Sequence, residues 1–167
     1  MGKLGLATYA LMVSIVLWGI LLGGGIYSMM VYFPAYLSHL PESAVVVTGP
    51  YGLNEGSFWL SIHPLVILSF IVSLTLNWRN RGRRRLIGTV FVVYALILVV
   101  TQAYFLPELS AFRQSAQSGI SNIEWQQRTG RWQLLNAVRA VVILANFVML
   151  LLALARPGTT KQLLFDA

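Results

Sequence analysis

The sequence predicts an all-α integral membrane protein built as a bundle of four transmembrane helices. Of its 167 residues, 57% are hydrophobic and only 10% are charged, whereas a soluble domain carries about a quarter charged residues. The apolar residues form four runs, each near the length of about 20 residues that a helix needs to cross a bilayer. Five arginines at positions 79–85 separate the second run from the third. We therefore expect one integral membrane domain with the lipid bilayer as its solvent.

The composition also excludes other classes of protein. The net charge of +7 follows the loops, and the chain has neither zinc-finger spacing nor an aromatic RNA-binding signature, so nucleic acid is not an expected partner. The absence of cysteine excludes disulfides, thiolate metal sites and cysteine nucleophiles. No phosphate-binding glycine loop is present, because the run at 23–25 lies within an apolar segment.

The first helix is expected over about residues 8–33, ending near Pro34. No convincing cleavage site follows its apolar run, which indicates a retained spanning helix and not a signal peptide. Gly19 and Gly23 are four residues apart and allow close approach of another helix. Tyr27 lies four residues further on, on the same face.

The second helix is expected over about residues 57–77. Proline prefers the first turn of a helix, but a start at Pro64 would leave too few residues to cross the membrane. Pro64 should therefore lie inside the helix, kink it and leave the Leu60 carbonyl without its usual partner. Such a kink, directly after His63, is a place where a cavity can open between helices.

The third and fourth helices are expected over about residues 86–106 and 134–154. Ser121-x-x-Glu124 forms a capping box, so the last helix should begin near Ser121, ahead of its membrane span. Both helices then extend beyond the bilayer as a helical hairpin that closes near Gly119.

The basic cluster sets the expected topology. Because arginine and lysine beside a spanning helix resist translocation, the loop at 78–85 is expected in the cytoplasm, together with both termini. The segments at 34–56 and 107–133 then lie outside, and the first of these contains a strand-like run at 45–47. The arginine loop is expected to act as a topological anchor without further chemistry.

Three helices each carry a line of polar residues on one face. In the fourth helix Trp125, Trp132, Arg139 and Asn146 are seven residues apart, and Asn136 is four from Trp132. The other two lines are Tyr94, Thr101 and Glu108 in the third helix and Glu55, Trp59 and His63 in the second. Because lipid disfavours exposed polar groups, the lines should face one another. Two interpretations remain open: hydrogen bonds that only lock packing, or an outward-opening pocket.

His63 is the candidate for proton chemistry, since histidine is the side chain that titrates near neutral pH. Haem ligation by His39 and His63 is an alternative, although no familiar ligation pattern supports it. A metal site of His63, Glu55 and Glu108 lacks a Glu-x-x-His pair. A Ser–His–Asp triad lacks an outer Asp. Neither a metal nor a cofactor is therefore expected.

Two short motifs resemble those of the small four-helix membrane proteins that include the anthrone oxygenases. The motifs are Gly25-x-Tyr27 with Pro34, and Trp132-x-x-x-Asn136-x-x-Arg139. The resemblance implies an oxygenase without metal or flavin, in which a base deprotonates the substrate and the resulting anion reacts with dioxygen. By this resemblance His63 is the base and Arg139 stabilises the oxyanion, while Asn136 and Trp132 shape an aromatic pocket. The arginine-rich loop and the long hairpin have no counterpart in these motifs.

Two functions follow as hypotheses. In the first, an outward-opening pocket binds an apolar aromatic or quinone-like molecule, with or without oxygenase activity; His63 and Arg139 are catalytic, and the ligand-binding residues are Tyr27, Glu55, Trp59, Tyr94, Thr101, Glu108, Trp132 and Asn136. In the second, the protein is a non-catalytic accessory subunit of a larger membrane complex, such as a respiratory one, and the polar lines contact other subunits or further copies of the chain. Whether the protein is an enzyme stays open at this point.

Overall fold

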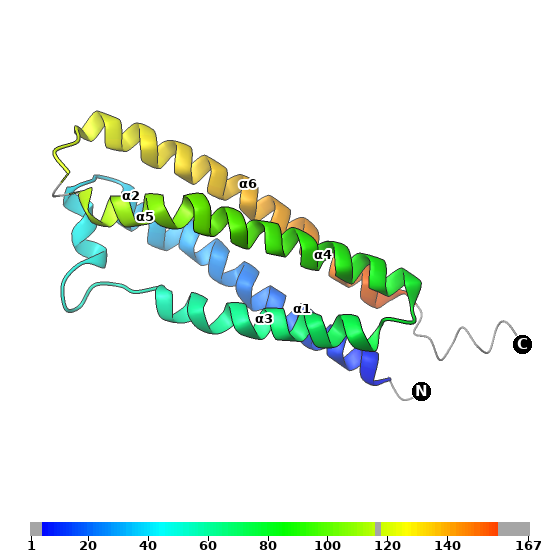
Figure 1. The fold of residues 1–167 in the computed structure, drawn as a ribbon. Helices are drawn as coiled ribbons and strands as arrows, with labels where there is room; N and C mark the ends of the chain where they lie inside the picture. Colours follow the sequence, from blue (N-terminus) through cyan, green and yellow to red (C-terminus); the bar gives the residue numbers. More distant parts are fainter. Residues whose placement is uncertain (1–4, 116–117, 157–167) are drawn as a thin grey trace, which may run out of the picture. The chain divides into compact units, whose positions relative to one another are not determined.

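The computed structural model describes residues 5–115 and 118–156, which contain helices and no strand. The charged residues next to the two termini, Lys3, Lys161 and Asp166, which would lie in the cytoplasm with the predicted termini, are outside these residues. Four helical stretches are long and apolar enough to cross a membrane (Figure 1): Leu6–Leu37, Gly56–Leu76, Arg81–Arg113 and Asn122–Ala155. The predicted all-α fold with four membrane-spanning helices is confirmed, and the chain is an integral multi-pass membrane protein. The side of the membrane on which the termini lie stays a prediction.

The sequence predicted that the first spanning stretch ends near Pro34. In the structure the stretch continues past this proline to Leu37. Helix α1 (Leu6–Tyr27) continues through a π-helical turn, η1 (Ser28–Tyr32), into α2 (Phe33–Leu37). Proline lacks an N–H and its ring collides with the carbonyl four residues earlier. The wider π turn just before Pro34 relieves that collision, so the helix runs on.

The third spanning stretch also contains a proline, Pro107, that is preceded by a π-helical turn. Helix α4 (Arg81–Val100) leads through a second π turn, η3 (Thr101–Phe105), into α5 (Leu106–Arg113). Pro107 is the second residue of α5, as Pro34 is of α2. π turns inside helices occur frequently at functional sites, and η3 contains one of the predicted site residues, Thr101.

Helix α3 (Gly56–Leu76) contains Pro64 in its interior, which confirms the prediction from span length. The run at 45–47 was expected to be strand-like, but it belongs to a 3₁₀ helix, η2 (Glu42–Val47). A strand needs a neighbour for its backbone groups, whereas a 3₁₀ turn satisfies them within the segment.

Helices α5 and α6 (Asn122–Ala155) form the predicted helical hairpin. The Ser121 hydroxyl accepts a hydrogen bond from the Glu124 N–H at 3.3 Å, which confirms the N-cap. Gly119 has a φ of 67°, a conformation that glycine adopts without steric cost. Across the hairpin, the Phe112 and Trp125 rings meet edge to face with their centroids 5.9 Å apart.

The described chain divides into two compact units. Unit 1 consists of the described residues within 1–22, 58–95 and 143–167, and unit 2 consists of those within 23–57 and 96–142. In unit 1, the buried Trp18 ring contacts Phe70 and Tyr94 edge to face and donates its indole N–H to the Ile143 carbonyl. The core of unit 2 is richer in aromatic residues and comprises Tyr32, Phe33, Tyr36, Leu37, Leu40, Ala44, Phe105, Phe112, Trp125 and Trp132.

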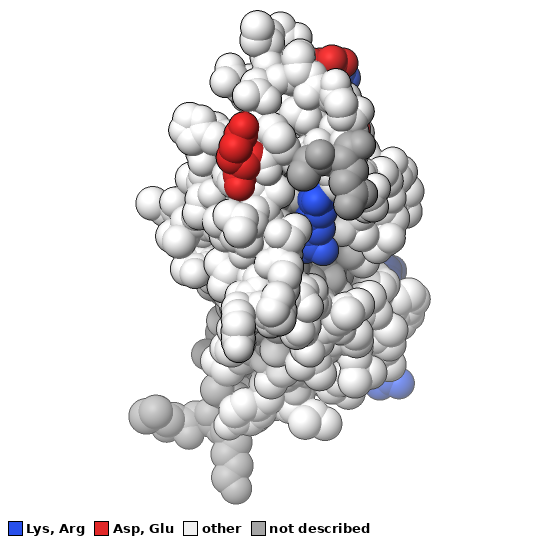
Figure 2. Space-filling model, turned by 90° about the vertical axis from the view of Figure 1, so that its left-hand side faces the viewer, with Lys and Arg blue, Asp and Glu red and all other residues white. Residues whose placement is uncertain are grey.

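The surface suits a lipid environment. Most of the face drawn in Figure 2 is neither basic nor acidic. Large apolar side chains are exposed along every spanning helix, including Val16, Leu68, Leu96 and Val141. In water such an apolar surface would be an aggregation hazard, whereas hydrocarbon solvates it.

The arginine cluster is not the loop that the sequence predicted. Only Asn77–Asn80 form a turn, and α4 begins at Arg81. The Asn80 side-chain oxygen accepts the Arg83 N–H at 3.1 Å, which caps the helix and explains its early start. Most of the basic cluster therefore occupies the first turns of a spanning helix.

One of these arginines also has a structural role, contrary to the expectation of a mere anchor. Arg83 is 3% exposed. Its guanidinium donates to the Arg156 carbonyl at 2.8 Å, to the Thr8 hydroxyl at 2.9 Å and to the Asn77 side-chain oxygen at 3.4 Å. A cation beside the last carbonyls of α6 is also favoured by the helix dipole. Arg83 thus joins α1, α4 and the end of α6 within unit 1.

We expect Arg83→Met to destabilise the protein by about 2 kcal/mol. Buried acceptors left without a donor cost about 1–3 kcal/mol, and the removal of a desolvated charge offsets part of that loss. Thermal unfolding in detergent micelles measures the change. Arg79→Met, at an exposed position in the preceding turn, is the matched control and should leave the unfolding temperature unchanged. Equal unfolding temperatures for the two variants would contradict a structural role for Arg83.

Candidate functional site

The predicted site residues are divided between the two units. Unit 1 contains Trp59, His63 and Tyr94, and unit 2 contains Tyr27, Glu55, Thr101, Glu108, Trp132, Asn136 and Arg139.

The first group is built around His63, which lies in α3 directly before Pro64. Its Nδ1 lies 2.6 Å from the Tyr94 hydroxyl of α4. The Trp59 ring, one helical turn earlier, stacks on the imidazole with centroids 5.6 Å apart and planes 25° apart. Tyr94 is buried beside Trp18. This packing fixes the plane of the imidazole and gives Nδ1 a defined partner.

The second group is built around Arg139, which lies within the apolar part of α6. Its Nη1 donates to the Thr101 hydroxyl at 3.1 Å and its Nη2 donates to the Asn136 side-chain oxygen. The guanidinium carbon lies 4.2 Å from the centroid of the Phe105 ring, a cation–π contact. The Thr101 hydroxyl in turn donates to the Ile97 carbonyl at 2.7 Å. Arg139 is therefore held by three neighbours from η3 and α6.

All of the recorded partners of Arg139 are neutral. In the described part of the chain its guanidinium contacts a hydroxyl, an amide oxygen and an aromatic ring, and it forms no ion pair. A positive charge within a membrane span that lacks a counter-ion is costly. An anion that forms beside this guanidinium would therefore be strongly stabilised, because no described acidic side chain is paired with the cation.

Trp132 belongs to the core of unit 2. It is 1% exposed and donates its indole N–H to the Phe105 carbonyl at 3.3 Å. The rings of Phe33, Phe105 and Phe112 surround it edge to face, with centroid distances of 4.6, 5.7 and 6.0 Å. Its contact with Phe105 supports the ring that lies under Arg139.

The two glutamates of the predicted site have other partners. Glu108 forms a salt bridge with Arg128 at 2.8 Å across the α5–α6 hairpin. Glu55 precedes α3 and accepts a hydrogen bond from Ser28 of η1 at 2.6 Å. Among residues 5–115 and 118–156, no group of three or more His, Asp or Glu side chains is placed to hold a metal ion.

The two remaining candidates lie at the surface. The Tyr27 side chain, at the end of α1, is 58% exposed. His39 is exposed in the turn that follows α2, where its backbone N–H donates to the Ser43 hydroxyl. Neither residue belongs to the groups around His63 and Arg139.

Phe105 and the π turn that carries it were missed by the sequence reasoning. Phe105 lies four residues after Thr101, a spacing that places both side chains on one helical face. The line through Thr101 was traced through polar residues, so it passed over this aromatic ring. The signal that was present is Pro107: a proline inside an apolar run implies a local change in helical geometry just before it.

Comparison with known proteins identifies the family of this chain. The sequence model of the family described as anthrone oxygenase matches residues 57–149, which is more than half of the chain. The matched region includes His63, Tyr94 and Arg139 and the second of the two motifs, while the Gly25-x-Tyr27 motif lies before it. No curated protein and no solved structure matches the chain. The chain belongs to the anthrone oxygenase family.

Proposed function

We propose that this protein is a membrane-embedded oxygenase that oxidises an apolar, anthrone-like aromatic substrate without a metal or flavin. The observation that carries the proposal is the guanidinium of Arg139, which lies within a membrane span and has only neutral partners among the described residues. A positive group of this kind would stabilise the oxyanion that such chemistry forms from an apolar molecule.

The proposed reaction starts at the methylene opposite the carbonyl of the substrate. His63 removes one proton, and the electron pair left behind is delocalised onto the carbonyl oxygen, where Arg139 stabilises the negative charge. The carbanion carbon transfers electrons to dioxygen and forms a C–O bond, which gives a hydroperoxide after protonation. Loss of the second methylene proton and cleavage of the O–O bond release water. One dioxygen is consumed, and the CH₂ group becomes a C=O group.

The proposal assigns a tautomer to His63. If Nδ1 carries the proton and donates it to the Tyr94 oxygen, the basic lone pair is on Nε2. The short Nδ1–Tyr94 distance and the stacked Trp59 ring support a fixed imidazole of this kind. Tyr94 is then a positioning residue, because it acts on the substrate only through His63.

The direct test is dioxygen uptake by the purified full-length protein in detergent with an anthrone as the substrate. We expect uptake above the spontaneous oxidation in a detergent blank, with one dioxygen per quinone formed and no loss of rate in a chelator. An absorption spectrum and metal analysis of the same sample test the haem alternative. Uptake equal to the blank would contradict the proposal. In that case, co-purification with other subunits at fixed stoichiometry would favour the accessory role.

A further inference from the structure

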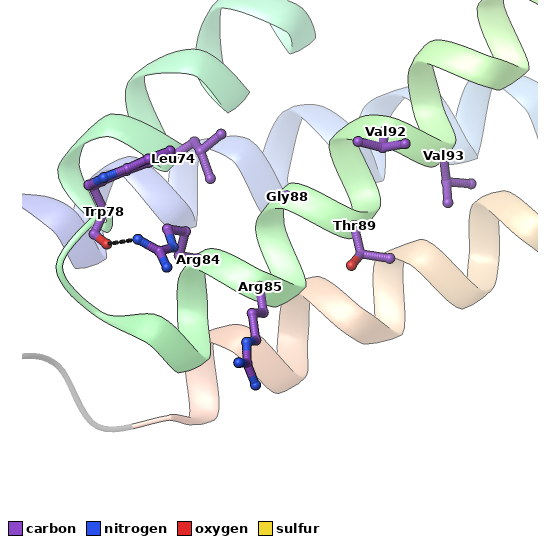
Figure 3. Close-up of a pocket in the computed structure, with 8 residues that line it drawn as sticks. All are labelled: Leu74, Trp78, Arg84, Arg85, Gly88, Thr89, Val92 and Val93. Carbon is purple, nitrogen blue, oxygen red and sulfur yellow. Dashed lines mark hydrogen bonds between the residues drawn. The ribbon is translucent and has the colours of Figure 1, made fainter.

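A groove between α3 and α4 has a different chemical character from the rest of the spanning surface. It has a volume of about 520 Å³ and lies wholly within unit 1. Leu74 and Trp78 line it from α3 and the turn that follows, and Figure 3 shows them together with the lining residues of α4. The lining residues from α4 are Arg84, Arg85, Gly88, Thr89, Val92 and Val93. The groove is thus basic at the helix start and apolar further along α4.

The positive charge at the basic end is not balanced by any described residue of unit 1. That unit contains Arg79, Arg81, Arg83, Arg84, Arg85 and Arg156, and its described residues include no aspartate or glutamate. The arginines also occupy the first turns of α4, where the helix dipole disfavours positive charge. Both effects are relieved when an anion binds.

The two groove arginines retain donors for such an anion. Arg84 donates once, to the Trp78 carbonyl at 3.2 Å, and its guanidinium carbon lies 4.9 Å from the centroid of the Trp78 ring. The Arg85 side chain is exposed and forms no hydrogen bond or ion pair with a described residue. Guanidinium groups have five donors each and match phosphate oxygens well.

The apolar end of the groove is open because residue 88 is glycine. A Cβ atom at Gly88 would meet Leu74 Cδ1 at 4.0 Å, and no other atom within that distance. The absent side chain therefore leaves a channel between the two helices, with Val92 and Val93 continuing its apolar wall. A tryptophan at the end of a spanning helix, such as Trp78, is typical of the headgroup level of a bilayer.

We propose that this groove binds one anionic phospholipid. Its headgroup phosphate contacts Arg84 and Arg85, and one acyl chain lies along Gly88 and Val92. A basic pocket between membrane helices that adjoins an apolar groove fits this class of ligand. A free anion would use only the basic end, and a neutral lipid would use only the apolar end.

The test is native mass spectrometry of the full-length protein in detergent, titrated with dioleoylphosphatidylglycerol or with dioleoylphosphatidylcholine. We expect the anionic lipid to be retained more strongly. An arginine that contacts the headgroup of an anionic lipid contributes roughly a fivefold change in affinity. The pair of substitutions Arg84→Gln and Arg85→Gln should therefore weaken retention of phosphatidylglycerol roughly 25-fold.

Matched variants distinguish lipid binding in this groove from non-specific electrostatic attraction between anionic lipids and the basic cluster. Arg79→Gln removes a charge at an exposed position that does not line the groove, and it should leave retention nearly unchanged. Gly88→Phe fills the groove and should reduce retention, whereas Gly88→Ala leaves space and should not. If Gly88→Phe does not fold, Thr89→Trp at the exposed groove wall serves instead.

Three outcomes would overturn the proposal. One is equal retention of the two lipids, and another is an Arg79→Gln effect as large as that of the arginine pair. The third is displacement of phosphatidylglycerol by millimolar inorganic phosphate, which would assign the site to a free anion. None of these results depends on oxygenase activity.

Discussion

We expect Arg139→Gln to lower kcat for anthrone oxidation by about 10²–10³-fold, the loss that follows removal of a group that stabilises a developing oxyanion. Glutamine retains a donor near Thr101 and Asn136 but carries no charge, so the change isolates electrostatic stabilisation. Because the anion forms only along the reaction path, KM should change little. Steady-state dioxygen uptake over a range of anthrone concentrations separates the two constants.

Two further variants make the Arg139 result specific. Arg139→Lys keeps the charge but loses the planar fork that contacts two side chains at once, and it should recover part of the activity. Arg131→Gln removes an exposed positive charge eight residues earlier on the same helix, and it should retain full activity. If Arg131→Gln lost as much activity as Arg139→Gln, the loss would follow from the lower positive charge of the protein and not from the position of Arg139.

The second large effect is expected at His63. His63→Ala should lower kcat by about 10²–10⁴-fold, which is the usual contribution of a positioned general base. Without dioxygen, the wild-type protein should catalyse exchange of the methylene protons of the substrate with deuterium from solvent water, and His63→Ala should not. This readout reports proton removal alone, so a merely structural role for His63 would not explain its loss.

The controls for His63→Ala are substitutions of the second histidine, His39, and of Tyr94, the hydrogen-bond partner of His63. His39→Ala changes an exposed residue outside both groups, and it should retain activity. A loss at both histidines together with a haem spectrum would favour the bis-histidine alternative. Tyr94→Phe keeps the buried ring but removes the hydroxyl that lies 2.6 Å from Nδ1. It should give a smaller loss than His63→Ala, because the base remains and only its orientation is relaxed.

Much of the architecture could be read from residue patterns. Span lengths alone predicted that Pro64 lies inside α3, and the structure confirms it. The Ser121–Glu124 spacing predicted the early start of α6, and the recorded N-cap confirms that too. These features depend on contacts within a few residues or on the thickness of a bilayer, so a local pattern contains the necessary information.

The features that were predicted wrongly lie where one sequence pattern is compatible with several backbone conformations. A proline in an apolar run can end a helix, kink it or follow a π turn. Pro34 uses the third solution, where the sequence had predicted the end of a helix. Pro107 also follows a π turn, and the prediction that the third helix continues past it into the hairpin is confirmed. The arginine cluster could have been a solvated loop, but Asn80 caps a helix that incorporates most of it. A sequence pattern shows that the backbone must adjust at such points, but not which adjustment has the lowest free energy.

The sequence by itself determined the class of this protein: an all-α, multi-pass membrane protein of four spanning helices, with polar residues placed at helical spacing within them. That information is carried by hydropathy and periodicity, which act along the chain. Only the tertiary structure decided the partners from other helices: Tyr94 for His63, Thr101 and Phe105 for Arg139, Arg128 for Glu108, and the helix-end carbonyls for Arg83. Several of these partners are more than 30 residues apart in sequence, and packing of the helices against one another, not the spacing within any one of them, selects which polar groups meet.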